Sequence, residues 1–381
     1  MSRSLSSVAF AMTGVLHRNG RALRQIRLLQ RLAERVDVIA GDANMARELF
    51  DGNVHLHGYD LPTTMGVRFF WDVHQRVRKL AAVIDSDVFH ASDLYVLPAM
   101  AKNARRRNAG LVYDAREFYP FVQGTVGKPW ATFFWSQLEA RFAPRADVVM
   151  TVSDSIADRI QDTYGIRRPV VVHNVPDRSR VEASRHLREN LPISESTVLV
   201  LHLGQIRQGR GCETLVRAMR SVGGAALVFV GTGPERNPLR ALVTSEGVES
   251  KVFFLDPVPY DQVLDVAAGA DVGVSLLEDT CLNHRFALPN KLFEYLMAGL
   301  PTIVSDFPEL GRVVKEFDVG LAVDPSKPDM VALAIQKMVD DEESRLRWQG
   351  NTSKVTETFS WSNASDTMTR AYQTLGIGGP T

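Results

Sequence analysis

The sequence has little cysteine and no long apolar run. Its 381 residues include only two cysteines, Cys212 and Cys281, which cannot form a disulfide framework, so a reducing compartment is favoured. No run of about 18 apolar residues is present, so we expect no membrane-spanning helix. The apolar stretch at residues 8–12 is too short for the hydrophobic region of a signal peptide. We therefore expect a cytoplasmic protein.

The sequence also lacks a net charge. Lys and Arg together number 44, as do Asp and Glu, so there is no dense basic domain of the kind that binds nucleic acid. The first 180 residues carry a modest positive excess, and the remainder carries the matching negative excess. This asymmetry favours an anionic acceptor or membrane surface, or an attraction between the two halves.

What the sequence does have is an alternation of short apolar runs with longer amphipathic stretches, over a length that exceeds one typical core. This alternation predicts parallel sheets with helical crossovers, and it restarts after a polar stretch at 176–196. We expect one Rossmann-like α/β domain at 1–180 and a second at 195–345. A helical tail follows at 346–381, and packing against the first domain is one arrangement open to it.

The expected elements follow this alternation. In the first domain we expect strands at 8–12, 36–40, 88–91, 111–114, 148–152 and 170–173, and helices at 21–35, 67–84, 130–143 and 154–164. In the second we expect strands at 198–203, 225–230, 252–255, 272–276, 302–305 and 320–323, and helices at 212–221, 238–246, 260–268, 290–298 and 328–340. Ligands bind at the carboxyl ends of such strands, where loops and helix N-termini converge.

The most informative segment is ALPNKLFEYLMAGLP, at residues 287–301. Pro289 favours a turn into a helix, Asn290 is a good N-cap, and the helix N-terminus is a ready phosphate site. The helix dipole disfavours Lys291 in the first turn, and a bound anion would offset that cost. Glu294 shares the face of Lys291 and could accept hydrogen bonds from ribose hydroxyls. A capped, half-buried helix with an exposed charge pair is the alternative.

With this segment the chain resembles a known family. The run PNKLFEY followed by AGLP is similar to the signature of the retaining glycosyltransferases of family 4, which have the GT-B fold. The resemblance continues in LGQIRQGRG at 203–211, VGTGP at 230–234, and HNVP at 173–176. It implies two Rossmann-like domains facing a central cleft. It also implies retaining transfer of a hexosyl-type sugar from a nucleotide donor to a glycan or lipid-linked acceptor, as in polysaccharide biosynthesis.

The resemblance also implies which residues form the site. Arg210 and Lys291 would neutralise the donor diphosphate, a chemistry that can proceed with no metal and no cofactor. Val258 would lie beside the base. The residues expected to bind the donor are Gly14, Gly204, Gln205, Arg207, Val258, Leu288, Pro289, Asn290, Leu292 and Glu294, and those expected to be catalytic are Arg210, Lys291, Arg116 and Glu117.

The sequence departs from the family pattern in three places. Gln205 stands where the family usually has an arginine, and Arg207 is placed to compensate. Phe286 stands where an acid commonly contacts the donor sugar, with Glu278, Asp279 or His284 as nearby substitutes. Arg116 replaces the histidine that usually precedes Glu117, which suits an anionic donor or acceptor, although a surface ion pair is the alternative.

Peripheral contact with a membrane is also considered. Arg24, Arg27, Arg31 and Arg35 are spaced to form a basic stripe on the first long helix. Two aromatic clusters are flanked by cations, and they consist of Phe69, Phe70 and Trp71, and of Trp130, Phe133, Phe134 and Trp135. Together these features could dock on an anionic membrane. A solvated helix face and core aromatics are the alternative.

Two other functions remain open. One is a nucleotide-sugar epimerase of related architecture, although Phe286 offers no acid or base to the sugar. The other is a degenerate member that binds nucleotide sugar or scaffolds an assembly pathway, which the changes at Gln205 and Phe286 would suit.

Overall fold

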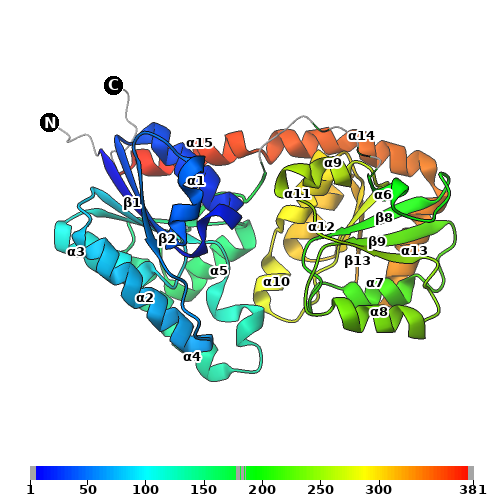
Figure 1. Cartoon of the computed structure of the whole chain (residues 1–381), viewed down its shortest axis with the longest axis horizontal. Coiled ribbons are helices and arrows are strands. Elements are labelled where there is room, and N and C mark those ends of the chain that lie inside the picture. Colours follow the sequence, from blue (N-terminus) through cyan, green and yellow to red (C-terminus); the bar gives the residue numbers. More distant parts are fainter. Residues whose placement is uncertain (1–5, 177–180, 182–183, 185, 376–381) are drawn as a thin grey trace. The chain divides into compact units, whose positions relative to one another are not determined.

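The computed structural model describes residues 6–176, 181, 184 and 186–375, and the chain divides into two compact units (Figure 1). Unit 1 comprises Met1–Asn174 and Ser362–Thr381, and unit 2 comprises Val175–Trp361. Each unit is built on one parallel β-sheet. The expectation of two Rossmann-like α/β domains is therefore confirmed.

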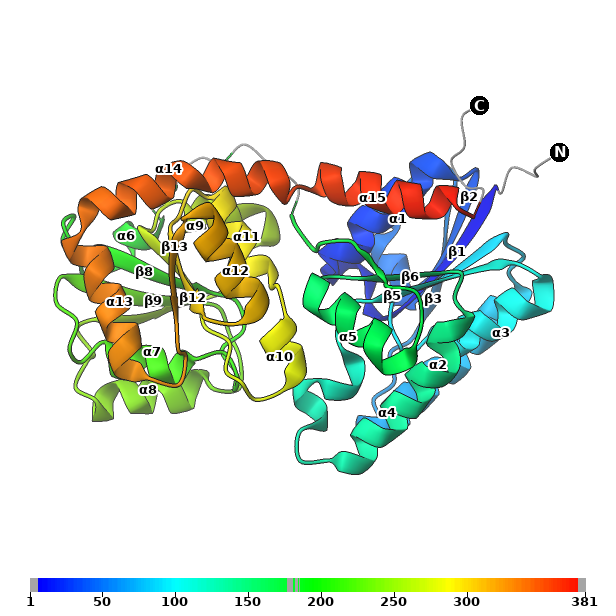
Figure 2. The ribbon, with the colours of Figure 1, turned by 180° about the vertical axis from the view of Figure 1, so that it is seen from behind.

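Unit 1 has a seven-stranded sheet in the order β3-β2-β1-β4-β5-β6-β7. Its strands are β1 (Ser7–Val15), β2 (Arg35–Gly41), β3 (Val54–Tyr59), β4 (Val88–Ala91), β5 (Gly110–Ala115), β6 (Val148–Thr151) and β7 (Val170–Val171). Its helices are α1 (Gly20–Leu32), α2 (Gly66–Val83), α3 (Leu97–Arg107), α4 (Pro129–Phe142), α5 (Asp154–Tyr164) and α15 (Trp361–Gln373). Helices α2, α3 and α4 lie side by side in one layer (Figure 2).

Unit 2 has a six-stranded sheet in the order β10-β9-β8-β11-β12-β13. Its strands are β8 (Val198–Leu203), β9 (Ala225–Val230), β10 (Val252–Leu255), β11 (Val272–Ser275), β12 (Thr302–Ser305) and β13 (Gly320–Val323). Its helices are α6 (His186–Glu189), α7 (Cys212–Ala218), α8 (Arg236–Ser245), α9 (Val263–Ala267), α10 (Leu282–Phe286), α11 (Asn290–Met297), α12 (Pro308–Phe317), α13 (Pro328–Asp340) and α14 (Glu342–Thr358).

The central strand of unit 2 shows why these runs are continuously apolar. Side chains alternate between the two faces of a strand. In β8, Val198 and Val200 enter the core beneath α7, α8 and α13, whereas Leu199 and Leu201 enter a second core that also contains residues of α9 and α11. A parallel sheet covered on both faces therefore favours apolar residues at successive positions, and this strand, apolar except for His202, is easily recognised in the sequence.

The tail divides between the two units. Helix α14 packs against α11, α12 and α13 of unit 2, whereas α15 belongs to unit 1. There the hydroxyl of Tyr372 lies 2.5 Å from Nδ1 of His90, and both side chains are buried. His90 is thus part of the contact between β4 and α15. Of the expected tail at 346–381, only the part from Ser362 onward is grouped with unit 1.

The prediction of a basic stripe on the first long helix is wrong. Arg24 is buried at 5% exposure and donates a hydrogen bond to Oδ1 of Asn174, while Arg35 lies beyond α1 at the start of β2. Only Arg27 and Arg31 are exposed on α1. Across the described ranges, no helix is both long and apolar enough to cross a membrane.

Candidate functional site

A pocket of about 280 Å³ opens at the carboxyl ends of β8 and β9 in unit 2. Several separate segments of the chain meet in its wall, among them Gly231 and Thr232 after β9 and Val263 of α9. The loop after β8 contributes Gly204 and Gln205, the segment after β10 contributes Val258, and α11 contributes Lys291 and Glu294. The structure thus brings together four of the residues expected to bind the donor with Lys291, which was expected to be catalytic.

The loop at 204–211 is held tightly against its neighbours. Gly204 has a φ of +94°, and its carbonyl group is so close to Gly231 that a Cβ on Gly231 would overlap it. Gly209 and Gly211 also have positive φ, and a Cβ there would collide with His284 and Leu276 respectively. Since L side chains rarely adopt this conformation, the backbone path of the loop depends on these glycines.

Helix α11 begins at Asn290, one residue earlier than an N-cap at that position would imply. Asn290 is its first residue and Pro289 occupies the cap position, where no side chain accepts a capping hydrogen bond. The prediction that Asn290 is the N-cap is therefore wrong. Pro289 has a φ of −74° and a ψ of 148°, an extended conformation that leads the chain into the helix.

The remaining expected donor residues of this segment differ in exposure. Leu288 and Leu292 are buried at 4% and 0% exposure, so their side chains belong to the core rather than to the pocket wall. Pro289 and Asn290 are half-buried and do not line the pocket.

Tyr295 connects α11 to the sheet, a role that the sequence analysis did not anticipate. Its buried hydroxyl accepts a hydrogen bond of 2.8 Å from the amide of Leu203 and donates one of 3.1 Å to the carbonyl of Val274. A Cβ on Gly273 would collide with the Tyr295 ring. These contacts hold α11 in place against β8 and β11. They therefore fix the positions of Lys291 and Glu294 relative to the ends of these strands.

Lys291 lies in an electrostatically unfavourable place. A Cβ on Gly204 would stand 3.3 Å from Cε of Lys291, and its Nζ lies 3.1 Å from Nε2 of His202. Burial, together with the positive charge of Arg210, lowers the pKa of Lys291 to about 7. Burial and Lys291 hold the pKa of His202 well below its usual range, so this ring is neutral and its Nε2 accepts the hydrogen bond. A bound anion would stabilise the ammonium form of Lys291.

Two arginines of the loop complete this positive region. Arg207 and Arg210 are half-buried, and both lower the pKa of Lys291 through their charge. The loop is supported by Glu278, whose Oε1 accepts a 3.1 Å hydrogen bond from the amide of Gly211 and whose own amide donates to the carbonyl of Gly209.

The nearby groups considered as substitutes for an acid at Phe286 are engaged in the structure. Asp279 pairs with Arg285 at 2.6 Å on the surface, and Glu278 holds the loop. His284 is buried against Gly209, and burial, with the charge of Arg210, lowers its pKa to about 4. Phe286 itself is buried at 7% exposure.

The three expected residues of unit 1 lie near the carboxyl ends of its strands. Gly14 is the residue before the last one of β1 and has a φ of +92°. Arg116 and Glu117 directly follow β5, where Arg116 is half-buried and Glu117 is exposed. They lie in a different unit from the pocket residues described above.

Asp93 links two of these strand ends, and the sequence analysis missed it. Its carboxylate accepts hydrogen bonds from the amide and hydroxyl of Thr13 at 2.7 and 3.0 Å, and it pairs with Arg116 at 3.3 Å. Arg116 is thus oriented by a buried carboxylate rather than by an ion pair at the surface. The available signal was the position of Asp93 just beyond the expected strand at 88–91.

Comparison with known proteins identifies this architecture. Residues 184–355 match the family model described as glycosyl transferases group 1, and residues 21–180 match that of glycosyltransferase family 4. Over 196 residues the chain is 29% identical to an uncharacterised glycosyltransferase of Methanocaldococcus jannaschii, covering 50% of this chain and 49% of that one. Over 200 residues it is 26% identical to a D-inositol 3-phosphate glycosyltransferase of Corynebacterium glutamicum, covering 50% and 46%.

The fold is also similar to that of the Anabaena protein HepE in complex with UDP-glucose. The TM-score is 0.74 at 16% identity, over 97% of this chain and 99% of that chain. Both halves of the chain match glycosyltransferase family models, and the fold is of the GT-B type. The chain belongs to glycosyltransferase family 4. It spans about half the length of the curated relatives named above, and the matches give no support to the epimerase interpretation.

Proposed function

We propose that this protein transfers a hexosyl-type sugar from a nucleoside diphosphate donor to a glycan or lipid-linked acceptor, with retention of anomeric configuration and without a metal ion. The observation that carries this proposal is the position of Lys291, which is half-buried beside Gly204 and two arginines in the wall of a pocket that also contains Glu294. Such an arrangement suits a pyrophosphate next to a ribose.

The donor is oriented by groups from each wall of the pocket. Its pyrophosphate lies between the loop at 204–211 and the amino end of α11, where Arg210 and Lys291 provide positive charge. Glu294 accepts hydrogen bonds from the ribose hydroxyls, and Val258 lies beside the base. The UDP-glucose in HepE supports a uridine nucleotide as the first donor to test.

The chemical step separates charge, and the cations respond to it. The bond between the anomeric carbon and the diphosphate oxygen breaks, and the acceptor hydroxyl oxygen forms the new bond to that carbon while its proton is released. The departing diphosphate gains negative charge, which Arg210 and Lys291 stabilise without reorganising. These cations supply the neutralisation that a metal ion provides in other enzymes. Retention follows from the resemblance to retaining members of the family.

One experiment tests these points together. Purified protein is incubated with UDP-sugars, a glycan acceptor and EDTA, and the product is analysed by NMR. We expect transfer at an undiminished rate, with the donor's anomeric configuration in the new linkage. Loss of activity that Mn²⁺ restores would contradict metal independence, and an inverted linkage would contradict retention. Absence of both turnover and binding with every nucleotide sugar would overturn the whole proposal.

The pKa of Lys291 predicts how donor affinity changes with pH. Because a diphosphate binds the ammonium form, affinity is expected to be constant below pH 7, where Lys291 is already protonated in the free protein. Above pH 7 binding must take up a proton, so the affinity falls by up to about tenfold per pH unit. Calorimetry with UDP-glucose measures this, because its diphosphate keeps its charge over the range.

Lys291→Met provides the control for this pH profile. This variant keeps an apolar stem but has no group to protonate, so its affinity should be lower and independent of pH. A wild-type profile that is flat from pH 6 to pH 9, an interval chosen to bracket the pKa of about 7, would show that Lys291 does not contact the diphosphate.

A further inference from the structure

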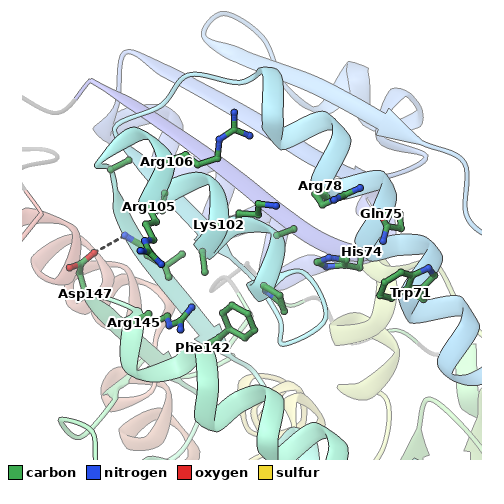
Figure 3. A pocket seen from close by; sticks show the side chains of 16 residues that line it. Trp71, His74, Gln75, Arg78, Lys102, Arg105, Arg106, Phe142, Arg145 and Asp147 are labelled. Atoms are coloured by element: carbon green, nitrogen blue, oxygen red, sulfur yellow. Dashed lines mark hydrogen bonds between the residues drawn. The ribbon is translucent and has the colours of Figure 1, made fainter.

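Unit 1 contains a large groove on the side of its sheet that holds the amino ends of β5 and β6. It has a volume of about 990 Å³ and lies between α2, α3 and the end of α4 (Figure 3). We call it the basic groove, because its wall contains five cations, which are Arg78 of α2, Lys102, Arg105 and Arg106 of α3, and Arg145 beyond α4. This concentration contrasts with a chain whose formal net charge is zero.

The cations of the basic groove have no acidic partners among the described residues. The one carboxylate in the wall, Asp147, instead accepts a 2.8 Å hydrogen bond from the amide of Leu111. Arg145 lies over the ring of Phe142, with 5.2 Å between its Cζ and the ring centroid. Five positive groups that lack internal neutralisation attract an anionic partner from outside.

Apolar surface continues from the basic groove. A smaller pocket of about 140 Å³ shares Trp71, His74 and Pro98 with it and is otherwise lined mainly by apolar side chains such as Val67 and Phe134. Exposed aromatic side chains of α2 and α4, two of which also line this pocket, form what we call the aromatic ridge. Its members and their exposed fractions are Trp71 at 61%, Trp130 at 58%, Phe133 at 67% and Phe134 at 46%.

The basic groove is separate from the strand ends that carry Gly14 and Arg116. The wall of the basic groove includes Leu111, near the start of β5, and Asp147, just before β6. These positions lie at the amino ends of the strands, whereas Gly14 and Arg116 lie at the carboxyl ends. A partner of the basic groove is therefore neither the sugar donor nor the hydroxyl group that receives the sugar.

We propose that the basic groove and the aromatic ridge together bind an anionic lipid bilayer. Lipid phosphates neutralise the five cations, and the exposed Trp and Phe side chains enter the boundary between headgroups and acyl chains. A free phosphate would use the cations alone and leave the aromatic ridge in water. The combination of both features favours a membrane, and this binding is independent of the proposed transferase activity.

Vesicle binding by the full chain tests the proposal. We expect the protein to sediment with vesicles of phosphatidylcholine mixed with phosphatidylglycerol, and not with phosphatidylcholine alone. The double variant Lys102→Glu with Arg105→Glu changes two exposed side chains. It should bind at least about 25-fold more weakly, since each cation near the surface contributes on the order of fivefold. Circular dichroism and thermal unfolding verify that the variant remains folded.

The exposed arginines of α1 provide a matched control. Arg27→Glu with Arg31→Glu makes the same change in net charge on the same unit but outside the basic groove. We expect this variant to bind vesicles nearly as well as the wild type. Equal losses in the two double variants would overturn the proposal, because net charge alone would then explain binding.

The aromatic ridge is tested separately. Trp130→Ser with Phe133→Ser should weaken vesicle binding at least about tenfold, because interfacial aromatic side chains contribute apolar contact. Tryptophan fluorescence of the wild type should shift to shorter wavelength on vesicle binding. Unchanged binding by this variant would overturn the proposal. Tighter binding of the wild type to a single-stranded oligonucleotide than to the vesicles would do so as well.

Discussion

Replacement of Lys291 with methionine is expected to lower kcat for sugar transfer about 100- to 1,000-fold. The ammonium group is half-buried and is desolvated next to Arg210, where a charge acts more strongly than in bulk water. It stabilises the negative charge that develops on the departing diphosphate, and methionine keeps the packing of the stem but not the charge. Steady-state kinetics with a saturating donor measure the effect.

Two other variants separate this role from general damage. Glu294→Gln, in the same pocket, should mainly raise KM for the donor, because the ribose is held equally in the ground state and the transition state. Lys315→Ala removes an exposed cation, paired with Asp306 on the surface, and should leave both constants unchanged. If Lys291→Met raised KM but left kcat unchanged, Lys291 would be a binding group rather than a catalytic one.

The pocket at the ends of β8 and β9 could be predicted from the sequence because its parts are local patterns. Apolar runs such as β8 must be buried on both faces, so their ends are easily located, and parallel strands bring those ends together. The glycines at 204, 209 and 211 and the PNKLFEY run then fall at one edge of the sheet. Five assigned residues, among them Gly204, Lys291 and Glu294, consequently line one pocket.

Contacts between segments that are distant in the sequence could not be predicted. Asp93 and Tyr295 each join elements that are far apart in the sequence, and nothing in their immediate neighbourhood indicates their partners. Arg24 was assigned to an exposed stripe from its helical spacing with Arg27 and Arg31, yet Asn174 provides its partner 150 positions further along the chain. Helical spacing predicts which residues share a face, but not which neighbours cover that face.

Several elements were missed for local reasons. The edge strand β3 contains two histidines and a glycine, which weaken its apolar signal. Helix α3 ends in three consecutive arginines and was not recognised, although Pro98 near its start and Asn108 at its end are typical helix boundary signals. As a result, the wall of the basic groove could not be assembled from the sequence.

Loss of the carboxylate of Asp114 is expected to lower the free energy of unfolding of unit 1 by about 3–5 kcal/mol. Asp114 is fully buried at the end of β5 and forms a two-point ion pair with Arg21 of α1, at 3.0 and 2.7 Å. Although burial alone would raise the pKa of Asp114, the guanidinium of Arg21 holds it below its ordinary value. Asp114→Ala would leave Arg21 as a buried charge whose remaining bond, to the carbonyl of Val172, cannot compensate it.

The expected loss comes from the uncompensated charge rather than from the pair itself. Native-state hydrogen exchange of the β5 amides in urea measures it within unit 1. Asp158→Ala, which removes an exposed carboxylate paired with Arg168, should cost less than about 1 kcal/mol. Arg21→Met combined with Asp114→Leu should recover most of the stability, because apolar side chains of similar volume replace a buried pair at little cost. If the single variant Asp114→Ala were as stable as the wild type, water would have to solvate Arg21 in the variant. The expectation of an uncompensated buried charge would then be wrong.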